Sequence, residues 1–216
     1  MKNYLFQKVL FVLFLLIPIL AIGQERKNPN LNLSFYYKTG NTKINSLEYK
    51  NLNGNSEVIE LVLASKFGRN LNSQLEIGLN FNQFSSNIAS ISEGSVINNS
   101  LEINYLQIPI TIARYFNLSS GGERSLVEPY IKSGIVASKH LQSTSSSINF
   151  KDKVSSQGWD AYLKGGFGIA LNMDSNWQAN IGVEGIMSFR KDRDINKSLK
   201  PTMEGMYIFL GITYKF

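Results

Sequence analysis

The sequence contains no cysteine and only one histidine. Without cysteine there can be no disulfide bond, thiolate metal site, cysteine nucleophile or lipid anchor on an N-terminal cysteine. With His140 as the only imidazole, a metal site would need carboxylates as its main ligands. No spacing of acidic residues suggests such a site, so we expect no metal and no other cofactor.

Long apolar runs and clusters of positive charge are also missing. The longest apolar run, Val9 to Ala21, falls short of the roughly 20 residues that a spanning helix needs, and Pro18 interrupts it. This excludes a helical membrane protein. The formal net charge of +6 is spread along the chain, so we expect no binding to nucleic acid.

Residues 1–23, MKNYLFQKVLFVLFLLIPILAIG, have the layout of a secretory signal peptide. Lys2 and Lys8 charge its start, and Ala21-Ile22-Gly23 offers small residues at the two positions that a signal peptidase reads. We expect cleavage before Gln24, in preference to an uncleaved N-terminal anchor. The remaining residues, 24–216, then form a single domain.

The rest of the chain alternates between apolar and polar residues, which is the pattern of strands with two unlike faces. In residues 31–38, for example, Leu31, Leu33 and Phe35 share one face. The sequence predicts eight strands, at 31–38, 57–67, 74–84, 100–116, 126–138, 159–172, 177–190 and 204–216. In the fourth run the apolar set shifts by one residue, which predicts a β-bulge near Tyr105 and Leu106.

The connections are predicted to alternate between short and long. The short ones are 68–73, 117–124 and 173–176, and the long, polar ones are 39–56, 85–99, 139–158 and 191–203. Outer-membrane barrels have this layout, with short periplasmic turns and longer outer loops. We therefore expect an all-β fold, an eight-stranded antiparallel up-and-down transmembrane β-barrel.

A water-soluble sandwich or lipocalin-like barrel would also alternate. The polar face, however, mixes charged, aromatic and glycine residues, as in Asp160, Tyr162, Lys164 and Gly166, which suits a confined interior better than a solvated surface. Five aromatic residues near strand ends are expected to form girdles at the membrane interfaces: Tyr115, Phe116, Trp159, Trp177 and Phe189. These features favour the membrane barrel.

Four segments resemble strands of the PorT-like outer membrane β-barrel family of Bacteroidetes. They are YLQIPITIARYF from Tyr105, PYIKSGIVAS from Pro129, FGIALNMDSNWQANIGVEGIM from Phe167 and LGITYKF from Leu210. The similarity covers most of residues 30–216. It implies an integral outer-membrane barrel, and the family takes its name from a member linked to protease export through the type IX secretion route.

The inward face of the predicted barrel carries acids and bases in near balance. The acids are Glu60, Glu76, Glu102, Glu128, Asp160 and Glu184, and the bases are Lys38, Lys66, Lys132, Lys164 and Lys215. We expect them to pair and fill the lumen, because unpaired charges in a closed interior are costly. The alternative is a charged path for ions or solutes.

His140 falls in a serine-rich stretch, with serines at 138, 143, 145, 146 and 147. This composition leaves open a lipid hydrolase at the membrane rim, built on a Ser-His-acid set. A serine-rich loop places serines near any histidine by chance, so we expect no enzymatic activity.

Ile212, Tyr214 and Phe216 form an alternating apolar triplet at the end of the sequence. This triplet resembles the signal that barrel-assembly machinery recognises in outer-membrane proteins. The expected partners are thus outer-membrane lipid, that machinery during biogenesis, and a protein bound through outer loops or periplasmic turns. Two functions remain open: a structural, assembly- or secretion-related or partner-binding barrel, and a narrow channel or small-ligand carrier.

Overall fold

In the computed structural model, the described part of the chain folds into one closed antiparallel β-barrel. The structure describes residues 31–45, 52–67, 72–92, 95–118, 125–145, 159–189 and 202–216. The predicted signal peptide, residues 1–23, lies outside these ranges. No helix in the described ranges is long and apolar enough to cross a membrane.

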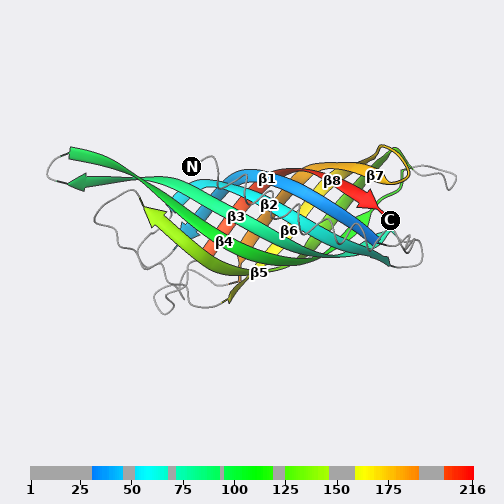
Figure 1. Cartoon of the computed structure of the whole chain (residues 1–216), viewed down its shortest axis with the longest axis horizontal. Helices are drawn as coiled ribbons and strands as arrows, with labels where there is room; N and C mark the ends of the chain where they lie inside the picture. Colours follow the sequence, from blue (N-terminus) through cyan, green and yellow to red (C-terminus); the bar gives the residue numbers. More distant parts are fainter. Residues whose placement is uncertain are drawn as a thin grey trace.

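Eight strands follow one another around the barrel in chain order (Figure 1). They are β1 (Leu31–Asn45), β2 (Leu52–Phe67), β3 (Ser73–Ser92), β4 (Ser95–Tyr115), β5 (Val127–Ser145), β6 (Trp159–Asn172), β7 (Trp177–Ser188) and β8 (Thr202–Lys215). β8 pairs with β1 from Asn32 opposite Lys215 to Asn45 opposite Thr202, so the sheet closes on itself. The predicted fold class is confirmed.

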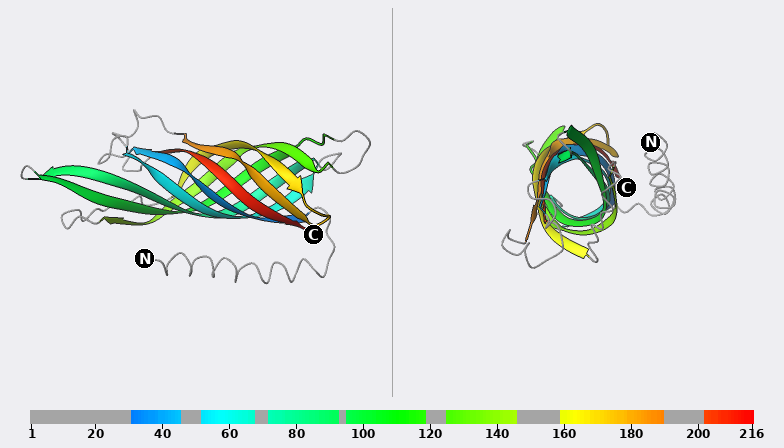
Figure 2. Two further views of the ribbon diagram at one scale, coloured as in Figure 1. Left: turned by 90° about the horizontal axis from the view of Figure 1, so that it is seen from above. Right: turned by 90° about the vertical axis from the view of Figure 1, so that its left-hand side faces the viewer.

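The first five strands are longer than the sequence pattern predicts. The expected loop at 39–56 is largely strand, because β1 reaches Asn45 and β2 begins at Leu52. The expected loop at 85–99 is instead the outer half of the β3–β4 hairpin, which projects past the other strands at the end opposite the C-terminus (Figures 1 and 2). Polar residues can extend a hairpin there because a ladder beyond the lipid needs no apolar face.

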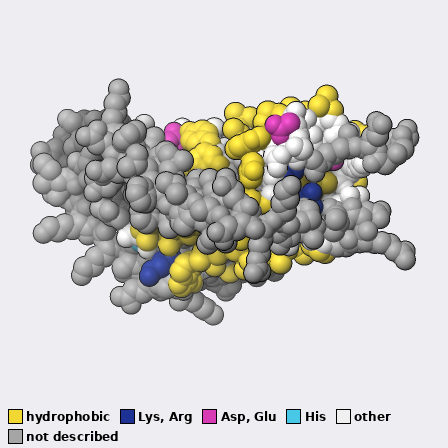
Figure 3. Space-filling model, turned by 45° about the vertical axis from the view of Figure 1, so that its right-hand side comes forward, with side chains coloured by type: hydrophobic (Ala, Val, Ile, Leu, Met, Phe, Trp, Pro, Cys, Tyr) yellow, Lys and Arg dark blue, Asp and Glu magenta, His cyan; other side chains and the backbone are white. Residues whose placement is uncertain are grey.

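The outer wall of the barrel is apolar along its middle. Outward side chains such as Leu63, Ile77, Ile131 and Phe167 are each at least 42% exposed. Figure 3 shows hydrophobic side chains gathered over the visible described part of this wall. A soluble barrel places its apolar face inward, so this surface is that of a barrel surrounded by lipid.

Three layers of side chains fill the interior beyond a polar group at the C-terminal end, which includes Ser34, Asn180 and Thr213. The first of these layers is aromatic: Tyr36, Tyr130 and Phe209 are buried with Val62 and Ala170, and Tyr115 packs against them. A charged layer follows. The third layer is mostly apolar, with Ile44, Val58, Phe84, Leu101, Ile103, Tyr105, Val136, Tyr162, Ile186, Met203 and Tyr207.

Two inward glycines make room for the aromatic layer. A Cβ atom at Gly211 would lie 2.2 Å from Cδ1 of Tyr36, and one at Gly168 would lie 2.8 Å from Cζ of Tyr130. Each ring therefore lies over a glycine of another strand. An eight-stranded barrel has just enough internal width for side chains, so large residues must face small ones.

The structure of β4 differs from our interpretation of the shift in the apolar set of residues 100–116. Alternation in β4 is unbroken, and Leu101, Ile103 and Tyr105 all point inward. Their apolar character serves the third interior layer, whereas Ile110 and Ile112 face outward. The register against β5 shifts between Asn104 and Tyr105, which confirms a bulge near Tyr105, although the additional residue is Leu141 of β5 and not a residue of β4.

Candidate functional site

A cluster of five buried charges crosses the lumen. It consists of Lys38 on β1, Glu60 on β2, Lys132 on β5, Lys164 on β6 and Glu184 on β7, and each residue is at most 5% exposed. Each charge points inward because inward positions recur every second residue. No two of the five are directly opposite each other in the strand register, and the tilt of the strands in the closed barrel brings them together. We call these five residues the lumen charge cluster.

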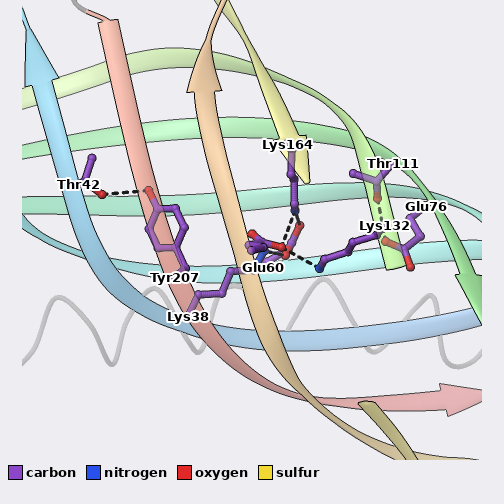
Figure 4. A network of polar contacts seen from close by, with 9 residues as sticks. Lys38, Thr42, Glu60, Glu76, Thr111, Lys132, Lys164 and Tyr207 are labelled. Atoms are coloured by element: carbon purple, nitrogen blue, oxygen red, sulfur yellow. Dashed lines mark hydrogen bonds and ion pairs between the residues drawn. The ribbon is translucent and has the colours of Figure 1, made fainter. Parts of the chain in front are cut away.

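Every member of the lumen charge cluster is paired. Glu184 contacts three lysines: Lys132 at 2.7 Å, Lys164 at 3.4 Å, and Lys38. Glu60 accepts a hydrogen bond from Lys164 at 2.8 Å and also pairs with Lys38. Figure 4 shows the four labelled members converging from different sides of the barrel.

Groups next to the cluster complete its surroundings. The Nζ atom of Lys132 lies 4.4 Å from the ring centroid of Phe209 and 5.3 Å from that of Tyr36. Glu76 is buried on β3, where it accepts a hydrogen bond from Thr111 at 2.8 Å (Figure 4). Three lysines thus face three glutamates, so the charges of this layer balance.

The other predicted lumen charges lie elsewhere. Lys215 is buried near the C-terminal end of the barrel and donates a hydrogen bond to Asn172. Lys66, Glu128 and Asp160 occupy inward positions but are only partly buried, toward the ends of their strands. None of these four takes part in the ion pairs of the cluster.

Glu102 is the exception, and its predicted inward position is wrong. It alternates with Leu101 and Ile103, which point into the barrel, so Glu102 lies on the outer face of β4. The sequence pattern led to the wrong face because we expected the apolar neighbours, Leu101 and Ile103, to face lipid. Beyond the lipid the preference reverses, and the polar residue faces water.

Four of the five aromatic residues predicted for the interface girdles lie on the outside of the barrel. Phe116, Trp159, Trp177 and Phe189 are exposed on the outside, each between 42% and 52%. Tyr115 instead points inward and stacks on Tyr130, with ring centroids 4.8 Å apart. Its assignment to the membrane interface is therefore wrong, because its position in β4 continues the inward alternation.

The C-terminal triplet lies on the outer wall of β8. The ring of Tyr214 contacts Trp177 at 4.9 Å and Phe216 at 5.1 Å between centroids. The backbone N–H of Phe216 donates to the carbonyl of Leu31 on β1 at 3.1 Å, directly at the seam that closes the barrel. Ile212 is 51% exposed on the same face.

Trp177 itself is fixed by a tight turn after β6. The carboxylate of Asp174 accepts hydrogen bonds from the backbone N–H groups of Asn176, at 2.7 Å, and Trp177, at 2.6 Å. These hydrogen bonds hold the pKa of Asp174 below its usual range. The turn, Trp177 and the triplet form one local structure at the C-terminal end of β8.

His140 lies on the inward side of β5, not on an outer rim. Its ring meets that of Tyr105 edge-on, with centroids 5.8 Å apart, and its buried Nε2 has no hydrogen-bond partner among the described residues. Ser138, one inward position away, accepts a hydrogen bond from Gln107. Serines 146 and 147 lie outside the described residues.

The described residues hold no group of three or more potential ligands that could bind a metal ion. Every charged side chain of the lumen charge cluster is paired with another member, whereas the buried hydroxyls of Tyr105 and Tyr130 have no hydrogen-bond partner among the described residues. This arrangement closes the interior. No charged group of the lumen charge cluster is left unpaired to coordinate a metal ion or to react with a substrate.

Comparisons with known proteins agree with the fold. No family model matches the chain, and no curated protein matches it. Among solved structures, the outer membrane protein OprG from Pseudomonas aeruginosa is similar with a TM-score of 0.53 at 14% identity, covering 87% of this chain and 96% of that one. The Neisserial surface protein A has a TM-score of 0.50 at 12% identity, covering 85% and 97%. The chain therefore has the fold of the eight-stranded outer-membrane barrels.

Proposed function

We propose that this protein is an integral outer-membrane barrel with a closed lumen, which acts as a structural or partner-binding element and not as a pore. The observation that carries the proposal is the lumen charge cluster, whose ion pairs join β1 and β2 to β5, β6 and β7. An ion would have to separate these pairs in order to pass. Isolated charges in a low-dielectric interior are strongly disfavoured, so the cluster opposes passage.

The location follows from three features taken together. The apolar outer wall needs lipid, the fold is that of outer-membrane barrels, and residues 1–23 have the pattern of a signal for export. The resemblance to PorT-like proteins supports a role in assembly or secretion at that membrane. Outer-membrane lipid and the barrel-assembly machinery are the partners that this location requires.

Conductance in planar lipid bilayers tests the closed lumen. The refolded protein is expected to give no steady ohmic current at moderate voltage, because the cluster and the aromatic layer fill the cross-section. A porin reconstituted by the same protocol serves as the positive control. Stable single-channel steps that scale with protein concentration would contradict the proposal and favour the narrow-channel alternative.

We further propose that the protein is not an enzyme, and that His140 fills space beside Tyr105. Changing His140→Ala is expected to leave any cellular phenotype of the wild-type gene intact. The measurement is complementation of a deletion strain, with lipid A and phospholipid deacylation assayed on the purified protein. Deacylation by the wild-type protein that His140→Ala abolishes would show that the histidine is catalytic.

A further inference from the structure

The projecting part of the β3–β4 hairpin has a strand edge that is left open within the described residues. β2 pairs with β3 only as far as Asn55 opposite Ser85. The Oγ atom of Ser86 then donates to the carbonyl of Asn53 at 2.6 Å. From Asn87 to Ser92, β3 pairs with β4 on one side and with no described strand on the other.

The register of the hairpin tells which backbone groups face this open edge. Pro109 of β4 has no N–H, and the described ladder is interrupted where Gly78 and Leu79 of β3 lie opposite Pro109 and Ile108. The N–H that Pro109 lacks can interrupt the β3–β4 ladder only if the nitrogen of residue 109 faces β3. Gly78, opposite Pro109, is therefore at a hydrogen-bonded position of this pair of strands. The register is constant from there to Ser92, and hydrogen-bonded positions alternate.

Even-numbered residues of β3 therefore bond to β4 in this hairpin. The N–H and C=O groups of Asn87, Ala89 and Ile91 point to the other side, toward the open edge. These three residues form a row of donors and acceptors spaced at two-residue intervals, which is complementary to an extended backbone.

The sequence of this edge lacks the usual protection against pairing. Exposed edges commonly carry lysine, proline or a bulge that prevents strand addition. Between Ser86 and Asn99 there is no lysine, no arginine and no proline, and the only charge is Glu93. The register between β3 and β4 contains no bulge in this region.

We propose that the edge from Asn87 to Ile91 binds an extended, uncharged segment of another protein by strand addition. This deepens the proposed partner-binding role and rests on it. Strand addition uses the backbone groups for affinity and leaves side chains to set specificity. The hairpin projects at the end opposite the C-terminus, which by the layout of such barrels is the cell-surface end (Figure 2).

A second copy of the chain fits this edge less well than a foreign segment. Two copies in one membrane point the same way, so their β3 edges could pair only in parallel, which is the less stable arrangement. β3 of one copy could meet β4 of another in antiparallel fashion, but that head-to-tail contact does not close into a dimer. A separate extended segment can pair antiparallel without either constraint.

The test uses a peptide that is already known to fit β3. The probe is a capped, fluorescently labelled peptide with the sequence of Ser95–Leu101, which pairs with the other edge of β3 in this structure. Its binding to the full-length protein in lipid nanodiscs is measured by anisotropy. A peptide with N-methyl groups on alternate amides serves as the ligand control.

Ala89→Pro removes an N–H group from the open edge and leaves the hydrogen bonds to β4 in place. It is expected to weaken binding of the probe about tenfold. Ala89→Thr keeps the N–H and is expected to bind like the wild type. Heat-modifiable migration on gels verifies that both variants are folded.

Equal binding by Ala89→Pro and wild-type protein, or no saturable binding of the probe to the wild type, would overturn strand addition. A wild-type dimer in nanodiscs or mild detergent that Ala89→Pro abolishes would also overturn it, because the occupant would then be a second copy. Conductance measured on the same samples is independent of these outcomes. Failure of the closed-lumen proposal can therefore be distinguished from failure of this one.

Discussion

Replacing Glu184 with glutamine is expected to lower the free energy of unfolding of the barrel by about 3–5 kcal/mol, because one partner of a buried ion-pair network is lost. Glu184 contacts Lys132, Lys164 and Lys38, more partners than any other carboxylate of the cluster. Its neutralisation leaves an uncompensated positive charge in the lumen. The measurement is urea unfolding of the protein in lipid vesicles, followed by fluorescence of Trp159 and Trp177.

A matched control and a rescue accompany this change. Glu204 is exposed on the outer face of β8, so Glu204→Gln is expected to stay within about 0.5 kcal/mol of the wild type. Adding Lys132→Met to Glu184→Gln restores the charge balance and is expected to recover part of the lost stability. If Glu184→Gln unfolds at the same urea concentration as Glu204→Gln, the cluster does not stabilise the barrel.

Replacing both Tyr214 and Phe216 with serine is expected to reduce sharply the heat-modifiable, folded form of the protein in outer membranes. Both side chains lie on the outer wall of β8, the strand that pairs with β1 and closes the sheet. If Tyr214 and Phe216 form the assembly signal together with Ile212, their loss prevents insertion of the barrel into the outer membrane. If they only anchor the finished barrel at the interface, insertion still occurs. Closure matters because an open strand edge cannot face lipid.

The structure also shows which single aromatic residue is a suitable control for the double variant. Trp177, which the sequence predicts at the membrane interface, contacts Tyr214 directly and so belongs to the same local structure. Phe116 is a better control, since it is an outward aromatic at the same end but on the segment after β4. Loss of one interface aromatic costs on the order of 1–3 kcal/mol of burial and leaves assembly intact. Equal folded yields for Phe116→Ser and the double variant would refute the assembly signal.

Most of the architecture could be predicted from the sequence, because the features that specify it are local. Alternation with a period of two determines which residues share a face of a strand, and eight such runs determine the barrel. The same pattern placed ten of the eleven predicted lumen charges on inward positions, Lys38, Glu60 and Glu184 among them. Strand order also follows, since consecutive strands in such a sheet are neighbours in space.

Other features depend on height along the barrel, which no local pattern encodes. Leu101 and Ile103 point inward while Glu102 points outward, because apolar residues fill the lumen beyond the charged layer. Tyr115, which the sequence predicts at the interface, lies inside because its position continues the inward alternation of β4 and its ring stacks on Tyr130 in the aromatic layer. The polar stretch 85–99 was expected to be a loop and is mostly strand, since its ladder is stabilised by pairing between β3 and β4.

The sequence by itself determined the fold class, the strand order and the charges available to the interior. Only the tertiary structure decided which charges meet, because Glu60 and Lys164 are 104 residues apart and Lys38 and Glu184 are 146 apart. Contacts across the lumen arise when the sheet closes, since closure brings side chains of opposite walls to the same height. The open edge of β3 is likewise a property of the assembled sheet, because it exists only where β2 ends its pairing before the hairpin does.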